Sequence, residues 1–319
     1  RGFDYGWEQF DSRFDLSQEK SLQETNRFGW VVEIDPHNPD QKPVKRTALG
    51  RFKHEGAEVT VGQGGRVVVY MGDDQRFDYI YKYVSADNWK SMRARGQSPL
   101  DVGSLYVAKF NDDGTGEWLE LTIENPSLAA KFSSQAEVLT YARIAADILG
   151  ATPMDRPEWI SVAPDDYVYC TLTNNSRRTV ADAANPLAPN NDGHIIRWKD
   201  SAKFTGTAFE WDIYVIAENT HDTEESFSDP DGLWADPDGR LFIETDGEIV
   251  SGTPPAQDAK AADPAVSEGS GLMQFQDKVV RFRAALIERL LDLPNAFNEV
   301  LYILRATSPT GSIMVYVRA

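Results

Sequence analysis

The sequence has one cysteine, no long apolar run and an excess of acids over bases, and each shortage excludes a class of protein. The single cysteine, Cys170, permits no intramolecular disulfide and no Cys-x-x-Cys metal cage. No window approaches the roughly 20 apolar residues of a membrane-spanning helix, and no signal peptide is visible. With 32 basic and 50 acidic residues, the formal net charge is −18. This charge argues against nucleic-acid binding, because phosphate backbones require clustered lysine and arginine.

Short strand-like runs dominate the first 250 residues. They are rich in β-branched and aromatic residues, and each is bounded by Gly, Pro, Asp or Asn, as in RVVVYMG, YVYCTLT and RLFIETD. The composition, 41% hydrophobic and 11% aromatic over 319 residues, suffices for a globular core. The pattern therefore predicts an all-β sandwich, barrel or propeller rather than an alternating βα fold.

An internal repeat decides among these folds. Three segments can be laid over one another: AEVTVGQGGRVVVYMGDD, PEWISVAPDDYVYCTLTNN and PDGLWADPDGRLFIETDG. Each reads as an acid, a short apolar strand, a turn and a second apolar strand, and hairpins of another kind lie between them. Alternating hairpins are typical of the inner and outer strand pairs of propeller blades. We therefore expect a β-propeller over 1–250.

The acids at the repeated position are Glu58, Glu158 and Asp231. The innermost strand of each blade begins near the propeller axis, so the three carboxylates would converge there. Converging carboxylates repel unless a cation holds them, and oxygen ligands favour ions such as Ca²⁺. Arg156 could bind an anionic oxygen ligand such as phosphate. The alternative is that the acids are turn residues and that Arg156 pairs with Asp155 or Glu158.

Other candidates are weaker. Glu55 lies three residues before Glu58, and the spacing does not fix whether both face inward. His194 and His221 fit structural roles better than metal binding. No P-loop, His-Glu-x-x-His, Gly-x-Ser-x-Gly or dinucleotide motif is present.

Three segments depart from the strand pattern. Helical periodicity over 127–151, ending at Gly150, predicts a helical insertion. Residues 251–271 are rich in Pro, Ala, Ser and Gly and predict a linker. Beyond it, 272–319 predicts a divergent C-terminal region made of an amphipathic helix and a hairpin.

Motifs in a fixed order carry a family resemblance. KRTALGRFKHEGAEV, YMGDDQRFDYIYKYV, DRPEWISVAP, PNNDGHIIRW and FSDPDGLWADPDGRLFIETDG, with others over 1–247, resemble the bacterial PhoX-type alkaline phosphatases. The resemblance implies a six-bladed β-propeller and a hydrolase of phosphate monoesters. It also implies Ca²⁺ and paired Fe³⁺ ions at the channel mouth and a periplasmic or secreted location. By this resemblance Glu58, Glu158 and Asp231 match metal-holding acids, and Arg156 matches a phosphate-binding arginine.

The chain also departs from this family. The family's iron-ligating cysteine lies upstream of RGFDYGWEQ, and Cys170 does not match it. The motifs end near Gly247, so we expect a chain truncated or altered at both ends, with an incomplete di-iron site. One alternative is a Ca²⁺-dependent propeller hydrolase of another class, a lactonase or phosphodiesterase, which needs neither iron nor Arg156. Another is an inactive propeller that binds a partner. The expected partners are small-molecule phosphate esters.

Overall fold

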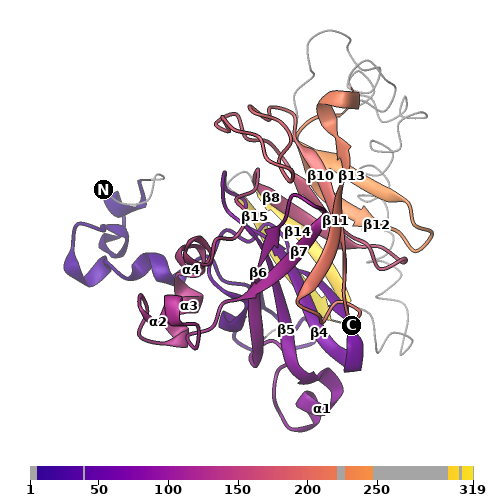
Figure 1. Ribbon diagram of the computed structural model, residues 1–319. Helices are drawn as coiled ribbons and strands as arrows, with labels where there is room; N and C mark the ends of the chain where they lie inside the picture. The colour runs from indigo at the N-terminus through magenta and orange to yellow at the C-terminus, as the bar shows by residue number, and fades with distance from the viewer. Residues whose placement is uncertain (1–5, 39, 221–226, 247–300, 309–310, 319) are drawn as a thin grey trace, which may run out of the picture.

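The computed structural model describes residues 6–38, 40–220, 227–246, 301–308 and 311–318. In these residues β-strands predominate and the helices are short (Figure 1). The all-β class predicted from the sequence is confirmed. The part of the chain that the structure describes contains no helix long and apolar enough to cross a membrane.

The elements follow one another in this order. The strands are β1 (Val32–Glu33), β2 (Val44–Lys45), β3 (Glu58–Val61), β4 (Arg66–Gly72), β5 (Ile80–Asn88), β6 (Gly103–Phe110), β7 (Thr115–Glu120), β8 (Pro157–Val162), β9 (Val168–Leu172), β10 (His194–Asp200), β11 (Ala208–Ile216), β12 (Pro230–Ala235), β13 (Leu241–Thr245), β14 (Leu301–Ser308) and β15 (Gly311–Arg318). The α-helices are α1 (Trp89–Ala94), α2 (Pro126–Ala129), α3 (Gln135–Thr140) and α4 (Ala142–Leu149). Short 3₁₀ helices are η1 (Trp7–Gln9), η2 (Ser12–Phe14), η3 (Glu19–Ser21), η4 (Glu24–Arg27), η5 (Thr47–Leu49), η6 (Gln63–Gly65) and η7 (Ala217–Thr220).

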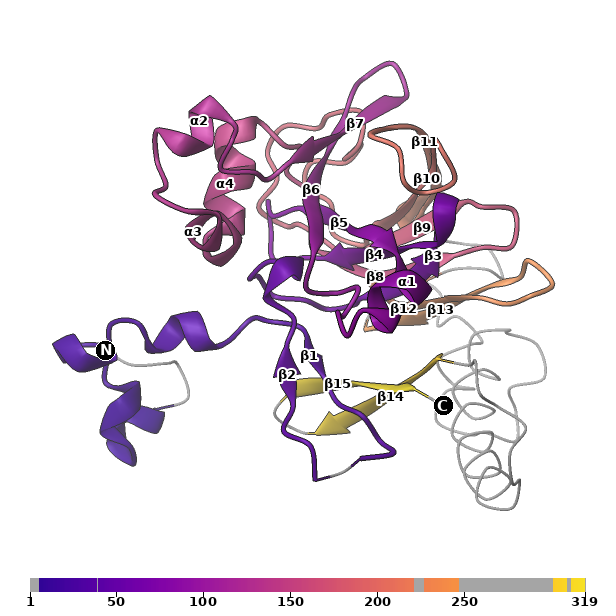
Figure 2. The ribbon, with the colours of Figure 1, turned by 90° about the horizontal axis from the view of Figure 1, so that it is seen from below.

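The largest sheet has nine antiparallel strands in the order β3-β4-β5-β6-β7-β11-β10-β9-β8. Its two ends meet, because β8 lies against both β3 and β4. The sheet therefore curls into a nearly closed ring, which Figure 2 shows. The β12–β13 hairpin is a separate sheet that packs on β8 and β9. Among the first strands of the three sequence repeats, β8 thus lies next to both β3 and β12.

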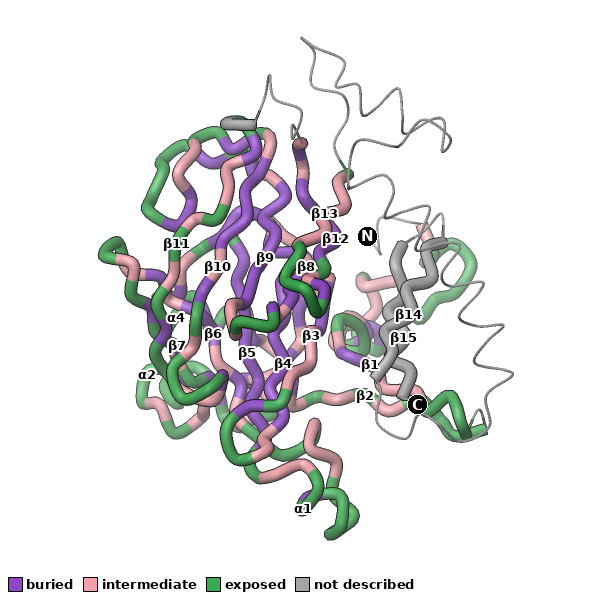
Figure 3. Tube along the Cα trace, turned by 90° about the vertical axis from the view of Figure 1, so that its right-hand side faces the viewer, coloured by how far each residue is buried: buried purple, intermediate pink, exposed green. Residues whose placement is uncertain are grey.

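Side chains alternate between two cores, as the pleat of a strand requires. Along β4, Val68 and Tyr70 join one core, whereas Val69 and Met71 join the other. The first core lies inside the ring and contains Trp118, Trp198 and Phe209 among its aromatic residues. Figure 3 shows the resulting burial, with β4, β5, β9 and β10 buried over most of their length.

The second core packs the outer face of the ring against short helices. The insertion predicted over 127–151 forms α2, α3 and α4 rather than one helix. The side chain of Asn125 caps α2 and that of Ser134 caps α3, so the second cap accounts for the break between α2 and α3, whereas α4 begins after Tyr141 without a side-chain cap. The last helix, α4, ends at Gly150, which has a φ of 71°.

A buried ion pair lies inside the ring. The Lys82 ammonium lies 3.0 Å from Asp200 Oδ2, donates to the Gly206 carbonyl at 2.7 Å and faces the Trp118 ring at 4.5 Å. Asp200 also accepts from Trp118 Nε1 at 2.7 Å and from the Tyr70 hydroxyl. The pair is fully buried and its hydrogen-bonding groups are matched, which is what makes buried charge tolerable.

The C-terminal region is described only in part. The hairpin predicted near the end is present as β14 and β15, paired from Leu301–Arg318 to Ser308–Gly311. The linker predicted over 251–271 and the helix predicted over 272–293 lie outside the described residues. The domain boundaries at 250 and 271 therefore stay predictions.

Candidate metal centre

Three hairpins carry the same backbone irregularity at the start of their first strand. In β8, the three steps from Pro157 to Ile160 face only two steps on β9, so one residue is extra. The same one-residue shift lies between Pro230 and Leu233 of β12. Such β-bulges turn a side chain out of the regular alternation and are common beside functional sites. Glu158 and Asp231 occupy these two bulges.

The third hairpin has its bulge just before β3. His54 bridges Asp73, and the regular ladder then starts at the pair Glu58–Tyr70. The four residue steps from His54 to Glu58 thus face only the three steps from Asp73 to Tyr70, which leaves one extra residue on the first strand. Glu55 is the first residue after the bridge. Its backbone N–H donates to the Gly72 carbonyl at 3.3 Å. Glu55, Glu158 and Asp231 therefore share one position, each directly after a paired residue.

The structure brings these three acids together. Each offers a carboxylate oxygen, and the three oxygens lie within 4.8 Å of one another. Glu158 and Asp231 are buried and Glu55 is half-buried. Burial, reinforced by the Asp231 carboxyl group, raises the pKa of Glu158 well above its usual range. The cluster is thus an oxygen-donor site whose charge a hard cation would neutralise.

Arg156 borders the cluster. Its Nη2 lies 3.1 Å from Glu158 Oε1, and its Nε lies 2.8 Å from Asp74 Oδ1. The residue has a φ of 58°, in the left-handed region that non-glycine residues rarely adopt. The Arg156 carbonyl accepts from the Thr173 N–H at 3.2 Å, which anchors this conformation. The guanidinium is therefore held at the edge of the carboxylates.

Side-chain hydroxyl groups hold the strand that carries Asp231. Thr171 Oγ1 donates to the Asp231 carbonyl at 2.6 Å and accepts from the Trp159 N–H at 3.0 Å. Thr173 Oγ1 donates to the Pro230 carbonyl at 2.9 Å. In the described residues, β12 and β9 are in contact but belong to different sheets, without backbone pairing between them. The threonine side chains therefore provide hydrogen bonds that connect the two strands.

Comparison with known proteins agrees with the motif order. The family model described as "Alkaline phosphatase PhoX" matches residues 2–275. The chain belongs to this family. No curated protein matches. Among solved structures, "Pseudomonas fluorescens PhoX in complex with vanadate, a transition state analogue" is similar, with 44% sequence identity and a TM-score of 0.70. The similarity covers 78% of this chain and 48% of that chain.

The relationship to PhoX determines the fold class, but the similarity covers only part of the solved PhoX chain. The Pseudomonas fluorescens protein is a β-propeller, so the propeller prediction is confirmed. The chain spans about half the length of that PhoX structure. The family match extends past Gly247 and includes the predicted linker 251–271.

Three of the four site residues predicted from the sequence lie together in the structure, and the fourth, Glu58, does not join them. Glu158, Asp231 and Arg156 lie together as the repeat suggested. Glu58, also predicted as a metal ligand, lies outside this group of carboxylates, whose third member is Glu55. The physical reason is the bulge: the repeat places Ala57 opposite Pro157 and Pro230, whereas the strand pairing places His54 there, and this shifts the acid by three residues. The shared signal was an acid after His54, Pro157 or Pro230.

Glu58 has a different environment. Its Oε1 accepts from the Val162 N–H of β8 at 3.2 Å. Burial raises the pKa of Glu58 to about 7, while the Val162 N–H opposes this by stabilising the charged form. The side chain thus faces the seam between the two end strands of the ring.

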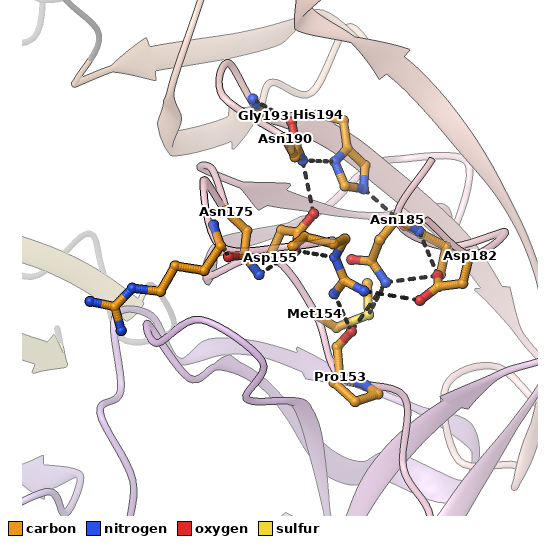
Figure 4. A network of polar contacts seen from close by, with 12 residues as sticks. Pro153, Met154, Asp155, Asn175, Asp182, Asn185, Asn190, Gly193 and His194 are labelled. Carbon is orange, nitrogen blue, oxygen red and sulfur yellow. Dashed lines mark hydrogen bonds and ion pairs between the residues drawn. The ribbon is translucent and has the colours of Figure 1, made fainter. Parts of the chain in front are cut away.

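A buried network supports the residue before Arg156 (Figure 4). Asp155 accepts from Arg178 Nε at 2.6 Å, Asn175 Nδ2 at 2.8 Å and Asn190 Nδ2 at 3.0 Å. His194 is next in the network, 3.0 Å from Asn190, and burial lowers its pKa. Three donors compensate the buried carboxylate. Both ring nitrogens of His194 have hydrogen-bond partners, Asn190 and the Ala184 carbonyl, and His221 lies outside the described residues.

Replacing Thr171 with valine should weaken cation binding about 10-fold, because hydrogen bonds to the residues that hold a metal orient their ligand atoms. The valine keeps the shape but leaves the Asp231 carbonyl and the Trp159 N–H without the hydroxyl. Calorimetric titration with Ca²⁺ measures the change. Thr207→Val, on an exposed residue, is the matched control. Equal affinities for both variants would show that Thr171 does not position Asp231.

Proposed function

We propose that the chain is a metal-dependent phosphatase that hydrolyses phosphate monoesters. Glu55, Glu158 and Asp231 would hold Ca²⁺, and Arg156 would bind the phosphate. The observation that carries the proposal is a guanidinium 3.1 Å from a carboxylate of a three-acid cluster. The PhoX relative supports it, because that protein was solved with vanadate, a transition state analogue.

Arg156 suits an oxyanion because its planar fork offers parallel donors. Nε and Nη2 both contact Asp74, at 2.8 and 3.1 Å, which orients the fork before substrate arrives. An entering phosphate would replace Asp74 on these donors. A cation held by the carboxylates would supply electrostatic stabilisation of the transferred phosphoryl group. The arginine's own part is to bind and align the ester.

The donor set fits a hard cation better than iron bound through sulfur. All three side chains offer carboxylate oxygens. Cys170 is buried in the core inside the ring and is not part of the cluster. We propose Ca²⁺ for the three acids. An Fe³⁺ pair, which the family resemblance implies, would need ligands beyond these three.

The location of the protein also stays a proposal. The family resemblance supports a periplasmic or secreted protein. Fractionation of the native organism with antibodies against the chain would test it, and recovery in the cytoplasmic fraction would contradict it.

Hydrolysis of p-nitrophenyl phosphate by the wild-type chain tests the proposed activity. We expect hydrolysis that stops on chelation and returns with Ca²⁺, supplied alone and with Fe³⁺. Arg156→Ala should lower kcat/KM by about 100-fold, since one donor to a developing oxyanion contributes this much. Its Ca²⁺ affinity should not fall, because the change removes a positive charge 3.1 Å from Glu158, and Arg93→Ala on an exposed residue of α1 is the control.

The rival functions give different results in the same assay series. Faster hydrolysis of a lactone or a phosphodiester, with no effect of Arg156→Ala, would favour a hydrolase of another class. Ca²⁺ binding without turnover of any ester would favour a binding role.

A further inference from the structure

The two end strands of the nine-stranded ring, β3 and β8, meet at a seam. In the described part of the chain, β3 pairs only with β4 and β8 only with β9, so no backbone hydrogen-bond ladder joins the two strands across this seam. Yet β3 and β8 lie in contact. Val162 pairs with Val168 on the β9 side, and its N–H donates across the seam to Glu58 Oε1 at 3.2 Å. A side-chain carboxylate thus replaces the missing ladder acceptor.

The same seam joins the two strands that carry cluster acids. Glu55 precedes β3, and Glu158 lies at the start of β8. Gly72, the last residue of β4, approaches this start of β8 so closely that a Cβ on it would lie 2.4 Å from the Glu158 carbonyl oxygen. A Cβ on Gly56 would lie 3.6 Å from that oxygen. A small shift of β8 relative to β3 would therefore change the separation of the two carboxylates.

We propose that Glu58 is a positioning residue: its bond to the Val162 N–H fixes β3 against β8 and so sets the distance between Glu55 and Glu158. Glu58 is not itself a ligand. The inference rests on the proposed function, since the distance matters through the cation that Glu55 and Glu158 would share.

Two substitutions separate positioning from ligation. Glu58→Gln keeps a carbonyl oxygen that can accept from Val162, but it removes the charge that a cation ligand needs. Glu58→Ala removes the acceptor. We expect Glu58→Gln to bind Ca²⁺ within about 3-fold of wild type. We expect Glu58→Ala to bind it at least about 10-fold more weakly, the usual effect of losing a group that orients a metal ligand. Titration with Ca²⁺ alone, without substrate, measures both.

A control removes side-chain hydrogen bonds to the backbone at a residue of α3 that is not part of the cluster. Gln135 accepts from the Ile123 N–H at 2.8 Å and donates to the Leu121 carbonyl at 2.8 Å, so Gln135→Ala should lower Tm but leave Ca²⁺ affinity unchanged. Equal Ca²⁺ loss in Glu58→Gln and Glu58→Ala would show that Glu58 is a ligand. Wild-type affinity in Glu58→Ala would show that it positions nothing. Either result overturns the proposal.

Amide exchange gives a readout that needs no cation. The Val162 amide should exchange faster in Glu58→Ala than in wild type and remain protected in Glu58→Gln. Unchanged protection in Glu58→Ala would overturn the proposal even if the wild-type chain bound no cation. Failure of wild-type Ca²⁺ binding with the expected exchange pattern would instead count against the proposed function alone.

Discussion

Replacing Glu158 with glutamine should weaken Ca²⁺ binding at least 100-fold and abolish cation-dependent phosphatase activity. Glu158 is the buried acid that meets both Asp231 and Arg156, so the change removes charge from the centre of the site. Affinity for Ca²⁺ depends on the number of charged ligands, and an amide oxygen is a weaker ligand than a carboxylate. Calorimetry with Ca²⁺ and hydrolysis of p-nitrophenyl phosphate provide the two measurements.

The same variant should change the pH dependence of binding. Because the pKa of Glu158 is raised, the wild-type cluster must release a proton when a cation binds, and affinity should rise with pH. In Glu158→Gln this proton release should disappear. Calorimetry in two buffers of different ionisation enthalpy detects it. Proton release unchanged from wild type would assign the proton to another group.

Folding controls keep the result interpretable. Without a cation, Glu158→Gln should be no less stable than wild type, because it removes carboxylate repulsion and leaves Arg156 paired with Asp74. Glu210→Gln makes the same chemical change on an exposed residue of β11 and should bind Ca²⁺ normally. Wild-type affinity in Glu158→Gln would exclude the proposed centre.

Local patterning in the sequence predicted the hairpins but not the bulges. The three repeated segments fold as the hairpins β3–β4, β8–β9 and β12–β13, as the repeat indicated, and β8 lies next to both β3 and β12. A bulge shifts the register by one residue and leaves little trace in an alternation of apolar and polar residues. Glu55 and Glu58 were therefore both compatible with the pattern, and only the bridge between His54 and Asp73 separates them.

Contacts between distant segments could not be read from the sequence. The alternative to phosphate binding by Arg156 was an ion pair with Asp155 or Glu158. In the structure Arg156 pairs with Glu158 and with Asp74, which is 82 residues away in the sequence. Asp155 instead forms an ion pair with Arg178. Within the nine-stranded sheet, β7 likewise pairs with β11, which places Glu117 opposite Ala208 although β8, β9 and β10 lie between them in the sequence. Spacing within one segment carries no information about such pairs.

Replacing Lys82 with methionine should lower the free energy of unfolding by about 3–5 kcal/mol, the usual result of leaving one member of a buried ion pair alone. Methionine fills similar space, so little of the loss would come from a cavity. Asp200 would keep Trp118 and Tyr70 but lose its cation, and the Gly206 carbonyl would lose its donor. Urea unfolding, followed by tryptophan fluorescence and by circular dichroism to check two-state behaviour, measures the change.

Two further variants separate loss of charge pairing from loss of packing. Arg95→Met breaks an exposed pair with Asp87 and should change stability little, because solvent screens surface ion pairs. The double variant Lys82→Met with Asp200→Asn should recover part of the loss, since it no longer buries an uncompensated carboxylate. A Lys82→Met chain as stable as Arg95→Met would mean that water reaches Asp200. A double variant less stable than Lys82→Met would show that the charged Asp200 carboxylate stabilises the fold through its hydrogen bonds from Tyr70 and Trp118 even when Lys82 is absent.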